Sequence, residues 1–295
     1  MKVAITGASG LIGGALVEDL RRDGHDVVRL VRREPAKQDE ARWDPHGTVD
    51  TSALEGCDAV VHLAGAGVAD RPWTSAYKQK IRDSRVRGTR VLAEAIAGMS
   101  DRPKVLVSGS AIGYYGDTGG REVDEESSMG GGFLAELVRD WEAAAGPAAD
   151  AGVRVVHART GVVLAREGGM LGKTLPLFKL GLGGKLGNGR QWVSWISLTD
   201  QLAALRHLLG GELAGPVNLT APRPVTNAAY TRAVGQALGR PAVLTVPRFA
   251  LRLALRGLAD EGPLISQRVL PRRLEASGFS FAHTDVDAAV RAAIG

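Results

Sequence analysis

The chain has 295 residues, of which 44% are hydrophobic, and its formal net charge is +5. A chain of this length and composition buries a sizeable core, which indicates a globular protein of enzyme size. Arginines are interleaved with acidic residues and no zinc-finger or RNA-binding signature occurs, so we expect no nucleic acid partner. No apolar run approaches the length of a membrane helix, and Met1 leads directly into a strand pattern, so we expect a cytoplasmic protein without a membrane partner.

The chain contains one cysteine, Cys57, which has no second thiol to pair with. A disulfide framework and a cysteine zinc site are therefore excluded, and we expect no metal. We predict that Cys57 is a small buried residue.

Apolar runs of strand length alternate with helix-period segments through the first half of the chain. This alternation predicts a doubly wound α/β fold with a parallel sheet covered on both faces. The expected strands are 2–6, 26–31, 58–65, 104–110 and 153–160, and the expected helices are 11–24, 77–97 and 133–150.

The pattern loosens after Gly161. Residues 166–212 are rich in glycine, a strand pattern returns at 216–220, and the rest of the chain is mostly helical with proline punctuation. We therefore expect a main domain at residues 1–165, rejoined by the strand at 216–220, and a smaller helical lobe at 166–295.

The stretch "GASGLIGG" (7–14) lies between the first strand and the first helix. Gly7 permits the tight turn, Gly10 permits close approach of a pyrophosphate to the backbone, and Gly13 permits helix and strand to pack. The first helical turn then presents free N–H groups to an anion, with Ser9, Leu11 and Ile12 beside it. The alternative is an ordinary glycine-rich turn.

Arg32 and Arg33 follow the second strand in "RLVRREP". NAD sites commonly place a carboxylate here for the ribose hydroxyl, whereas guanidinium groups suit the 2′-phosphate of NADP. We therefore predict NADP(H) as the cofactor. The alternative is that both arginines are solvated surface residues.

The chain resembles the atypical, extended short-chain dehydrogenases/reductases, and within them an epimerase-like subfamily with a carboxy-terminal extension. The resemblance covers nearly the whole length. It rests on "ITGASGLIGGAL" (5–16), "DAVVHLAG" (58–65), "SGSAIGYYGDTG" (108–119), "RTGVVLAREGGML" (159–171), "GLGGKLGNGRQWVSWISLTD" (181–200) and "QRVLPRRLEASGFSF" (267–281). It implies a Rossmann-like sheet, a dinucleotide at its switch point and a small, mostly helical C-terminal substrate lobe.

The resemblance also implies functional positions. Leu63, Ala64 and Gly65 match the backbone beside the adenosine part of the cofactor, and Arg159 and Gly161 match positions near the nicotinamide. Ser108 and Arg85 are further cofactor-side candidates. His62 is expected to be a packed strand histidine.

Ser110 matches the family's serine at the end of the fifth strand, whose hydroxyl polarises a reacting oxygen. The Tyr-x-x-x-Lys pair that normally works with this serine is absent, because Leu134 and Val138 occupy the best-aligned positions. Arg85 also replaces an asparagine that the family uses in proton relay.

Two interpretations of this absence remain open. In one, Tyr114 or Tyr115 on the loop after Ser110 supplies the acid or base, activated by the positive charge of Arg85. In the other, both tyrosines are packing residues that hold the loop.

The second lobe contributes two candidates for substrate binding. By resemblance, Arg190 matches an arginine that reaches a nucleotide-sugar phosphate, and Trp192 could stack a ring, although Trp192 and Trp195 also suit a core. The amphipathic segment 247–279 fits a membrane surface, a partner or a lid, and we expect it to be a lid or packing helix.

These features together predict an NADP(H)-binding, epimerase/dehydratase-like oxidoreductase that acts on a small, sugar-derived substrate. The alternative is a non-catalytic NADP(H)-binding regulatory or scaffold protein. By analogy with extended relatives, we also expect a homodimer whose subunits contact each other through the helices at 77–97 and 133–145.

Overall fold

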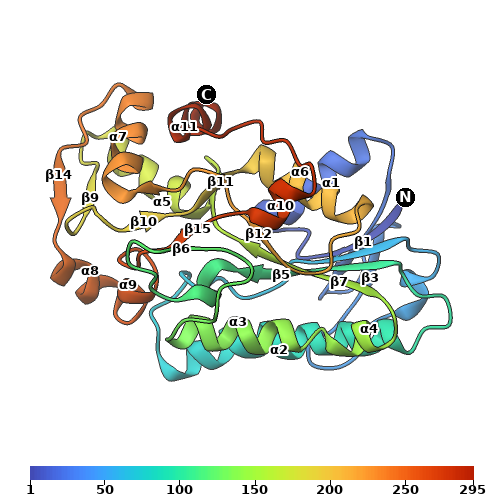
Figure 1. The fold of residues 1–295 in the computed structure, drawn as a ribbon. Helices are drawn as coiled ribbons and strands as arrows, with labels where there is room; N and C mark the ends of the chain where they lie inside the picture. The colour runs from blue at the N-terminus through green and yellow to red at the C-terminus, as the bar shows by residue number, and fades with distance from the viewer. The chain divides into compact units, whose positions relative to one another are not determined.

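The computed structural model describes residues 1–295 and shows an α/β fold around a seven-stranded parallel sheet (Figure 1). The strand order is β12-β7-β5-β4-β1-β2-β3. The strands are β1 (Lys2–Thr6), β2 (Asp26–Val31), β3 (Glu40–Arg42), β4 (Ala59–His62), β5 (Val105–Ala111), β7 (Arg154–Thr160) and β12 (Gly215–Leu219). The predicted Rossmann-like fold is therefore confirmed, and the return of the strand near residue 216 to this sheet is observed.

The direction of winding reverses between β1 and β4, which are parallel neighbours. From β1 the chain passes outward to β2 and β3, and it then returns to the other side of β1 as β4. The carboxyl ends of β1 and β4 therefore diverge at a topological switch point, where ligands bind in open α/β sheets.

Contacts divide the chain into two compact units, each made of several segments. Unit 1 comprises residues 1–110, 137–158 and 205–217, and unit 2 comprises residues 111–136, 159–204 and 218–295.

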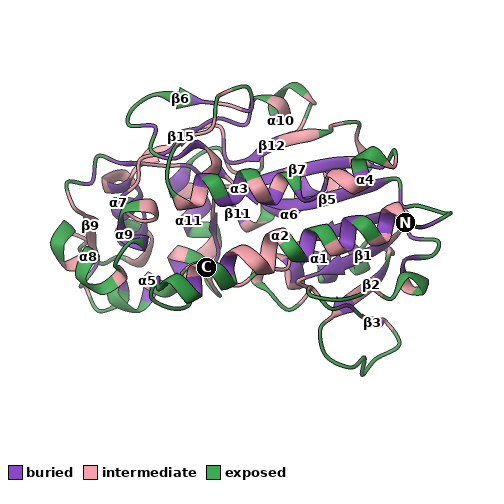
Figure 2. Cartoon of the chain, turned by 90° about the horizontal axis from the view of Figure 1, so that it is seen from below, coloured by how far each residue is buried: buried purple, intermediate pink, exposed green.

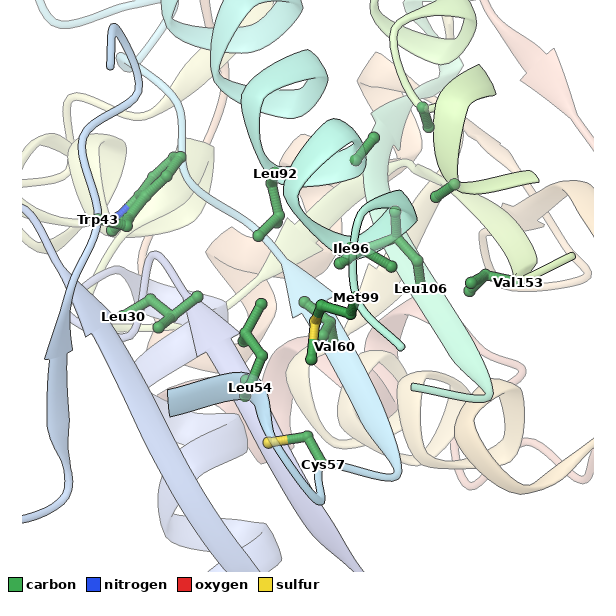
Figure 3. Close-up of a cluster of buried hydrophobic side chains, with 14 of the residues drawn as sticks. Leu30, Trp43, Leu54, Cys57, Val60, Leu92, Ile96, Met99, Leu106 and Val153 are labelled. Atoms are coloured by element: carbon green, nitrogen blue, oxygen red, sulfur yellow. The ribbon is translucent and has the colours of Figure 1, made fainter. Parts of the chain in front are cut away.

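The core of unit 1 lies between the sheet and the helices that cover one of its faces (Figure 3). These are α2 (Ser75–Ala97) and α4 (Gly146–Asp150), which pack against each other. Leu92 and Ile96 of α2 meet Val60 and Leu106 of the sheet, and all four are fully buried. Cys57 is a buried free thiol within this cluster, as predicted, and burial raises its pKa. The helix α1 (Leu11–Arg22) covers the opposite face (Figure 1).

The helix expected over 133–150 is two helices, α3 (Phe133–Ala143) and α4. Pro147 lies in the first turn of α4 and cannot donate a backbone hydrogen bond, so a new helix begins there.

The core of unit 2 is formed by helices packed on the short parallel pair β8 (Val162–Leu164) and β11 (Trp195–Ser197). These helices are α5 (Gly169–Lys179), α7 (Asn227–Leu238) and α11 (Val286–Ile294). Trp195 is fully buried at the centre, which confirms its expected core role.

The remaining elements complete the two units. They are β6 (Glu122–Val123), β9 (Gly184–Leu186), β10 (Trp192–Val193), β13 (Val225–Thr226), β14 (Leu244–Val246), β15 (Arg268–Val269), α6 (Leu198–Gly210), α8 (Arg248–Leu255), α9 (Leu258–Glu261), α10 (Arg272–Ala276) and the 3₁₀ helices η1 (Thr51–Leu54) and η2 (Ile112–Tyr115). Burial follows the layers, since β5 and β7 are largely buried whereas α8 is mostly exposed (Figure 2).

Candidate functional site

The turn after β1 requires glycine at two positions. Gly7 has a φ of +70°, and a Cβ there would lie 2.7 Å from the backbone carbon of Leu63. A Cβ on Gly13 would lie 2.2 Å from the carbonyl oxygen of Gly7. Only glycine permits contacts this close, so the turn, the first helix and the segment after β4 form one close-packed cradle.

Thr6, the last residue of β1, holds the other side of this cradle. The N–H groups of Leu63 and Ala64 donate to Thr6 Oγ1 at 3.1 and 3.2 Å. The Thr6 hydroxyl proton is therefore directed to His62 Nδ1, 2.7 Å away, which leaves the ring proton of His62 on Nε2. Burial, together with the charge of Arg85, lowers the pKa of the fully buried His62 to about 4, so His62 is the packed neutral histidine expected.

The N-terminus of α1 is open. Its N-cap, Gly10, provides no side-chain hydrogen bond, and the first turn contains no acidic residue. Ser9 and Gly10 are exposed, while Leu11 and Ile12 are partly buried. Free N–H groups and the positive end of the helix dipole make this end suited to a pyrophosphate.

The two arginines after β2 have different environments. Arg33 makes a two-pronged ion pair with Glu40, at 2.8 and 2.6 Å, which lowers the pKa of that carboxyl to about 2. Glu40 also pairs with Arg29 of β2. Arg32 is exposed and has no hydrogen bond or ion pair within the chain. Arg32 is therefore the guanidinium that remains available to a 2′-phosphate.

Arg85 lies against the segment after β4, where its Nη1 donates to the Ala66 carbonyl at 2.8 Å. Its guanidinium also lies 5.0 Å from the ring centre of Trp141, and burial lowers its pKa to about 10. A Cβ on Gly65 would be 3.2 Å from Arg85 Cζ, so Arg85 shapes the backbone of the Leu63–Gly65 stretch.

Ser110 lies near the end of β5 and is almost fully buried. Its hydroxyl donates to Glu142 Oε1 at 2.6 Å, whereas Ser108, two residues earlier, is completely buried within the strand. Leu134 and Val138 lie on α3 as predicted, so no tyrosine or lysine of this helix reaches the serine. Glu142 was not predicted from the sequence. It follows Leu134 and Val138 at the same spacing of one helical turn and therefore lies on the same face of α3.

Tyr115, on η2 in unit 2, is held in a buried network. Its hydroxyl donates to Asn218 Oδ1 at 2.8 Å and accepts from Arg159 Nη1 at 3.0 Å. Asn218 in turn donates its backbone N–H to Glu125 at 2.9 Å. Burial raises the pKa of Tyr115 to about 12, so this phenol is poorly suited to act as a base near neutral pH.

Tyr114 differs from its neighbour. It is partly exposed, and its hydroxyl has no hydrogen bond within the chain. The guanidinium carbon of Arg159 lies 3.6 Å from the centre of its ring. The cation that faces Tyr114 is therefore Arg159; Arg85 instead binds the segment after β4.

The C-terminal part of unit 2 holds the loop that carries both tyrosines. Gln267 donates from Nε2 to the carbonyls of Ile112 and Gly116 at 3.0 and 3.1 Å. Strand β15 pairs with β6, and Gly161 packs so closely against the Ser194 carbonyl that a Cβ would lie 2.5 Å from it.

The two substrate-side candidates are accessible to different degrees. Arg190 is exposed and has no side-chain partner, whereas Trp192 is partly buried with the Arg268 guanidinium 4.3 Å from its ring centre. One face of Trp192 is therefore already stacked.

The seven-stranded sheet, its switch point and the glycine cradle define a dinucleotide-binding protein of the Rossmann type. The chain belongs to the NAD dependent epimerase/dehydratase family, whose model matches residues 3–218. A second model, described as a domain of unknown function (DUF1731), matches residues 246–293. The predicted resemblance is thus confirmed, including the carboxy-terminal extension.

Relatives support this assignment over the full length. An epimerase family protein of Mycobacterium tuberculosis is 51% identical over 98% of this chain and 96% of its own. The crystal structure of human epimerase family protein SDR39U1 with NADPH has a TM-score of 0.92 and 35% identity, over 99% of this chain and 98% of that chain. A nucleoside-diphosphate sugar epimerase from Corynebacterium glutamicum has a TM-score of 0.81 and 40% identity, over 98% of this chain and 57% of that chain.

Proposed function

We propose that this protein is an NADP(H)-dependent oxidoreductase of the epimerase/dehydratase type that acts on a small, sugar-derived substrate. The observation that carries the proposal is the exposed, unpaired Arg32 beside a cradle that only Gly7 and Gly13 permit. The human relative of similar fold was crystallised with NADPH, which supports the same cofactor.

In this proposal the free N–H groups of the first turn of α1 bind the pyrophosphate, and Arg32 binds the 2′-phosphate. Leu63, Ala64 and Gly65 line the adenosine side, in a backbone shape set by Thr6 and Arg85. When bound, NADP(H) supplies the hydride donor or acceptor.

Ser110 is the proposed catalytic hydroxyl, and Glu142 is its positioning residue. Because the Ser110 proton points to Glu142, the lone pairs of Oγ are free to accept a hydrogen bond from a substrate hydroxyl. As Oγ takes up the substrate's proton, it releases its own proton to Glu142 Oε1, 2.6 Å away, so the serine stays neutral and the carboxylate becomes a carboxylic acid.

Tyr114 is the second proposed acid or base, since its hydroxyl is unoccupied and Arg159 lies against its ring. Positive charge at the ring face stabilises negative charge that develops on the phenol. Tyr115 has the structural role of fixing the loop. A Tyr114→Phe variant with unchanged turnover would remove Tyr114 from the mechanism.

We assign the substrate to the lobe at 166–295, with Arg190 as the contact for an anionic group, and the cofactor to the domain at 1–165. No helix of the structure is both long and apolar enough to cross a membrane. We propose a cytoplasmic location and, by analogy with extended relatives, a homodimer without nucleic acid.

A non-catalytic NADP(H)-binding role is the second candidate, because the helix that follows Ser110 has Leu134 and Val138 where the active relatives' pair would be. Titration of the cofactor-free protein with NADPH and NADH, followed by a panel of aldehydes, ketones and nucleotide sugars, separates the two. Preference for NADPH by about tenfold, with turnover, supports the enzyme. The same preference without turnover supports the binding protein, and no binding contradicts both.

A further inference from the structure

The most exposed large apolar side chains of the protein all lie in one region of unit 2. They are Leu180, Leu182, Val243, Phe249 and Leu253, which are 53 to 83% exposed. We call these five residues the apolar edge. Soluble proteins seldom gather exposed apolar side chains in this way unless the surface binds something.

The segments that carry the apolar edge lie side by side. Strand β14 pairs with β9, with Leu244 opposite Gly184. A Cβ on Gly187 would lie 3.0 Å from Arg248 at the start of α8. The segments that carry the apolar edge, from the end of α5 through β9 and β14 to α8, are therefore neighbours in unit 2.

The segment 247–279 packs as expected only after α8: Leu258, Val269 and Leu274 are buried, whereas α8 at the start of the segment is exposed. No residue of α8 is buried, and Figure 2 shows the helix largely exposed. Leu251 and Leu255 turn partly inward, while Phe249 and Leu253 form a stripe that faces solvent.

The segments that carry the apolar edge contain basic residues and no acidic ones, and the acidic residues nearest to α8 in the chain, Asp260 and Glu261, lie on α9. Residues 168–199 and 213–259 contain ten arginines and lysines and no aspartate or glutamate. Arg248 and Arg252 lie four residues apart on α8, on one side of the helix, and Arg256 follows directly as its C-cap with a φ of +51°. Arg252 pairs with Asp260, whereas Arg248 and Arg256 have no carboxylate partner.

In place of the expectation of no membrane partner, we propose that the apolar edge docks on an anionic lipid surface, with Phe249 and Leu253 at the acyl boundary and Arg248 and Arg256 at the headgroup phosphates. Arginines that flank an apolar stripe are typical of helices that lie in a membrane interface. A second copy of the chain fits less well, because the same face on two copies would bring these arginines together. A bilayer also needs no matching shape, so it accommodates side chains that project from separate segments.

The test measures co-sedimentation of the full-length protein with vesicles of phosphatidylglycerol and phosphatidylcholine, and with vesicles of phosphatidylcholine alone. We expect binding to the anionic vesicles that weakens with salt, and little binding to the neutral ones. A Phe249→Ser, Leu253→Ser variant is expected to lose this binding, and an Arg248→Glu, Arg256→Glu variant to bind at least about tenfold more weakly.

The matched control is Lys104→Glu, Arg121→Glu, which makes the same change of charge at two exposed residues without an ion pair, outside the apolar edge and outside the helices of the proposed dimer, and is expected to bind as the wild type does. NADPH titration and thermal unfolding of each variant report whether it is folded. The proposal is overturned if the wild type does not bind anionic vesicles, or if the Phe249→Ser, Leu253→Ser variant binds them as well as the wild type does. It is also overturned if light scattering shows a wild-type dimer that the serine variant dissociates, since the edge would then bind a second copy.

Discussion

The Ser110 hydroxyl donates a 2.6 Å hydrogen bond to Glu142 Oε1, which joins the end of β5 to α3 across 32 residues of sequence. The serine is therefore partnered by a carboxylate in a chain that has no Tyr-x-x-x-Lys pair. This bond orients the hydroxyl proton and leaves the oxygen's lone pairs for another donor.

The first prediction concerns the strength of this bond. In a double-mutant cycle of Ser110→Ala and Glu142→Ala, we expect a coupling of about 1 to 3 kcal/mol in the free energy of unfolding, because the acceptor is a carboxylate. Urea denaturation measures it. A cycle that replaces Glu142→Ala by Glu136→Ala, an exposed carboxylate on the same helix, is expected to be additive. Additivity in both cycles would remove Glu142 as the partner of Ser110.

The second prediction separates Arg32 from Arg33. Arg32→Ala should weaken NADPH binding by about tenfold or more and leave NADH binding unchanged, because a charge-assisted contact to the 2′-phosphate is lost. Arg33→Ala should change the preference much less, since Glu40 already holds that guanidinium. Fluorescence titration with both cofactors gives the ratio. An Arg32→Ala variant that keeps its preference for NADPH contradicts the assignment.

The third prediction compares two neighbouring glycines of α1. Gly13→Ala should destabilise the protein and abolish dinucleotide binding, because its Cβ would lie 2.2 Å from the Gly7 carbonyl oxygen. Gly14→Ala, whose Cβ would meet only the Ala8 carbonyl at 3.5 Å, should stabilise the helix by about 0.5 to 1 kcal/mol. Thermal unfolding and NADPH titration check both. Equal behaviour of the two variants would mean that the turn adapts to a side chain.

The fourth prediction concerns the adjacent tyrosines. Tyr115→Phe should cost about 1 to 3 kcal/mol of stability, because it removes the buried partner of Asn218 and Arg159. Tyr114→Phe should cost little, since its hydroxyl has no partner within the chain. Chemical denaturation of the two variants measures the difference, and the reverse order would contradict the assignment of roles.

The fifth prediction is a pH dependence caused by His62. Its folded pKa of about 4 lies below the ordinary value of 6.5, so the folded state resists protonation. The stability it contributes is complete above pH 6.5 and is lost as the pH falls toward 4, by roughly 1.4 kcal/mol per pH unit within that window. The urea midpoint should depend less on pH across this range in His62→Phe than in the wild type. It should keep its wild-type pH dependence in His46→Gln, which alters an exposed histidine. An unchanged slope in His62→Phe would assign the effect to other groups.

Local patterns were sufficient for much of the fold. The apolar runs predicted β1, β4, β5 and β7, and the glycine spacing predicted the turn at Gly7 and its packing partner Gly13. The break between α3 and α4 was missed, although "GP" at 146–147 is a signal that could have found it. The exposure of α8 was also missed, because an amphipathic pattern does not reveal whether a core is available to cover it.

The sequence by itself determined the Rossmann-type fold, the dinucleotide-binding turn and the absence of a Tyr-x-x-x-Lys pair. Strand and helix periods, glycine spacing and this motif are all properties of residues that are close together in the chain. Only the tertiary structure decided that Glu40 holds Arg33 and leaves Arg32 free, that Glu142 accepts a hydrogen bond from Ser110, and that Arg159 rather than Arg85 faces Tyr114. Each of these outcomes depends on an ion pair, a hydrogen bond or a ring contact. Such contacts form between side chains that only the folded backbone orients toward each other.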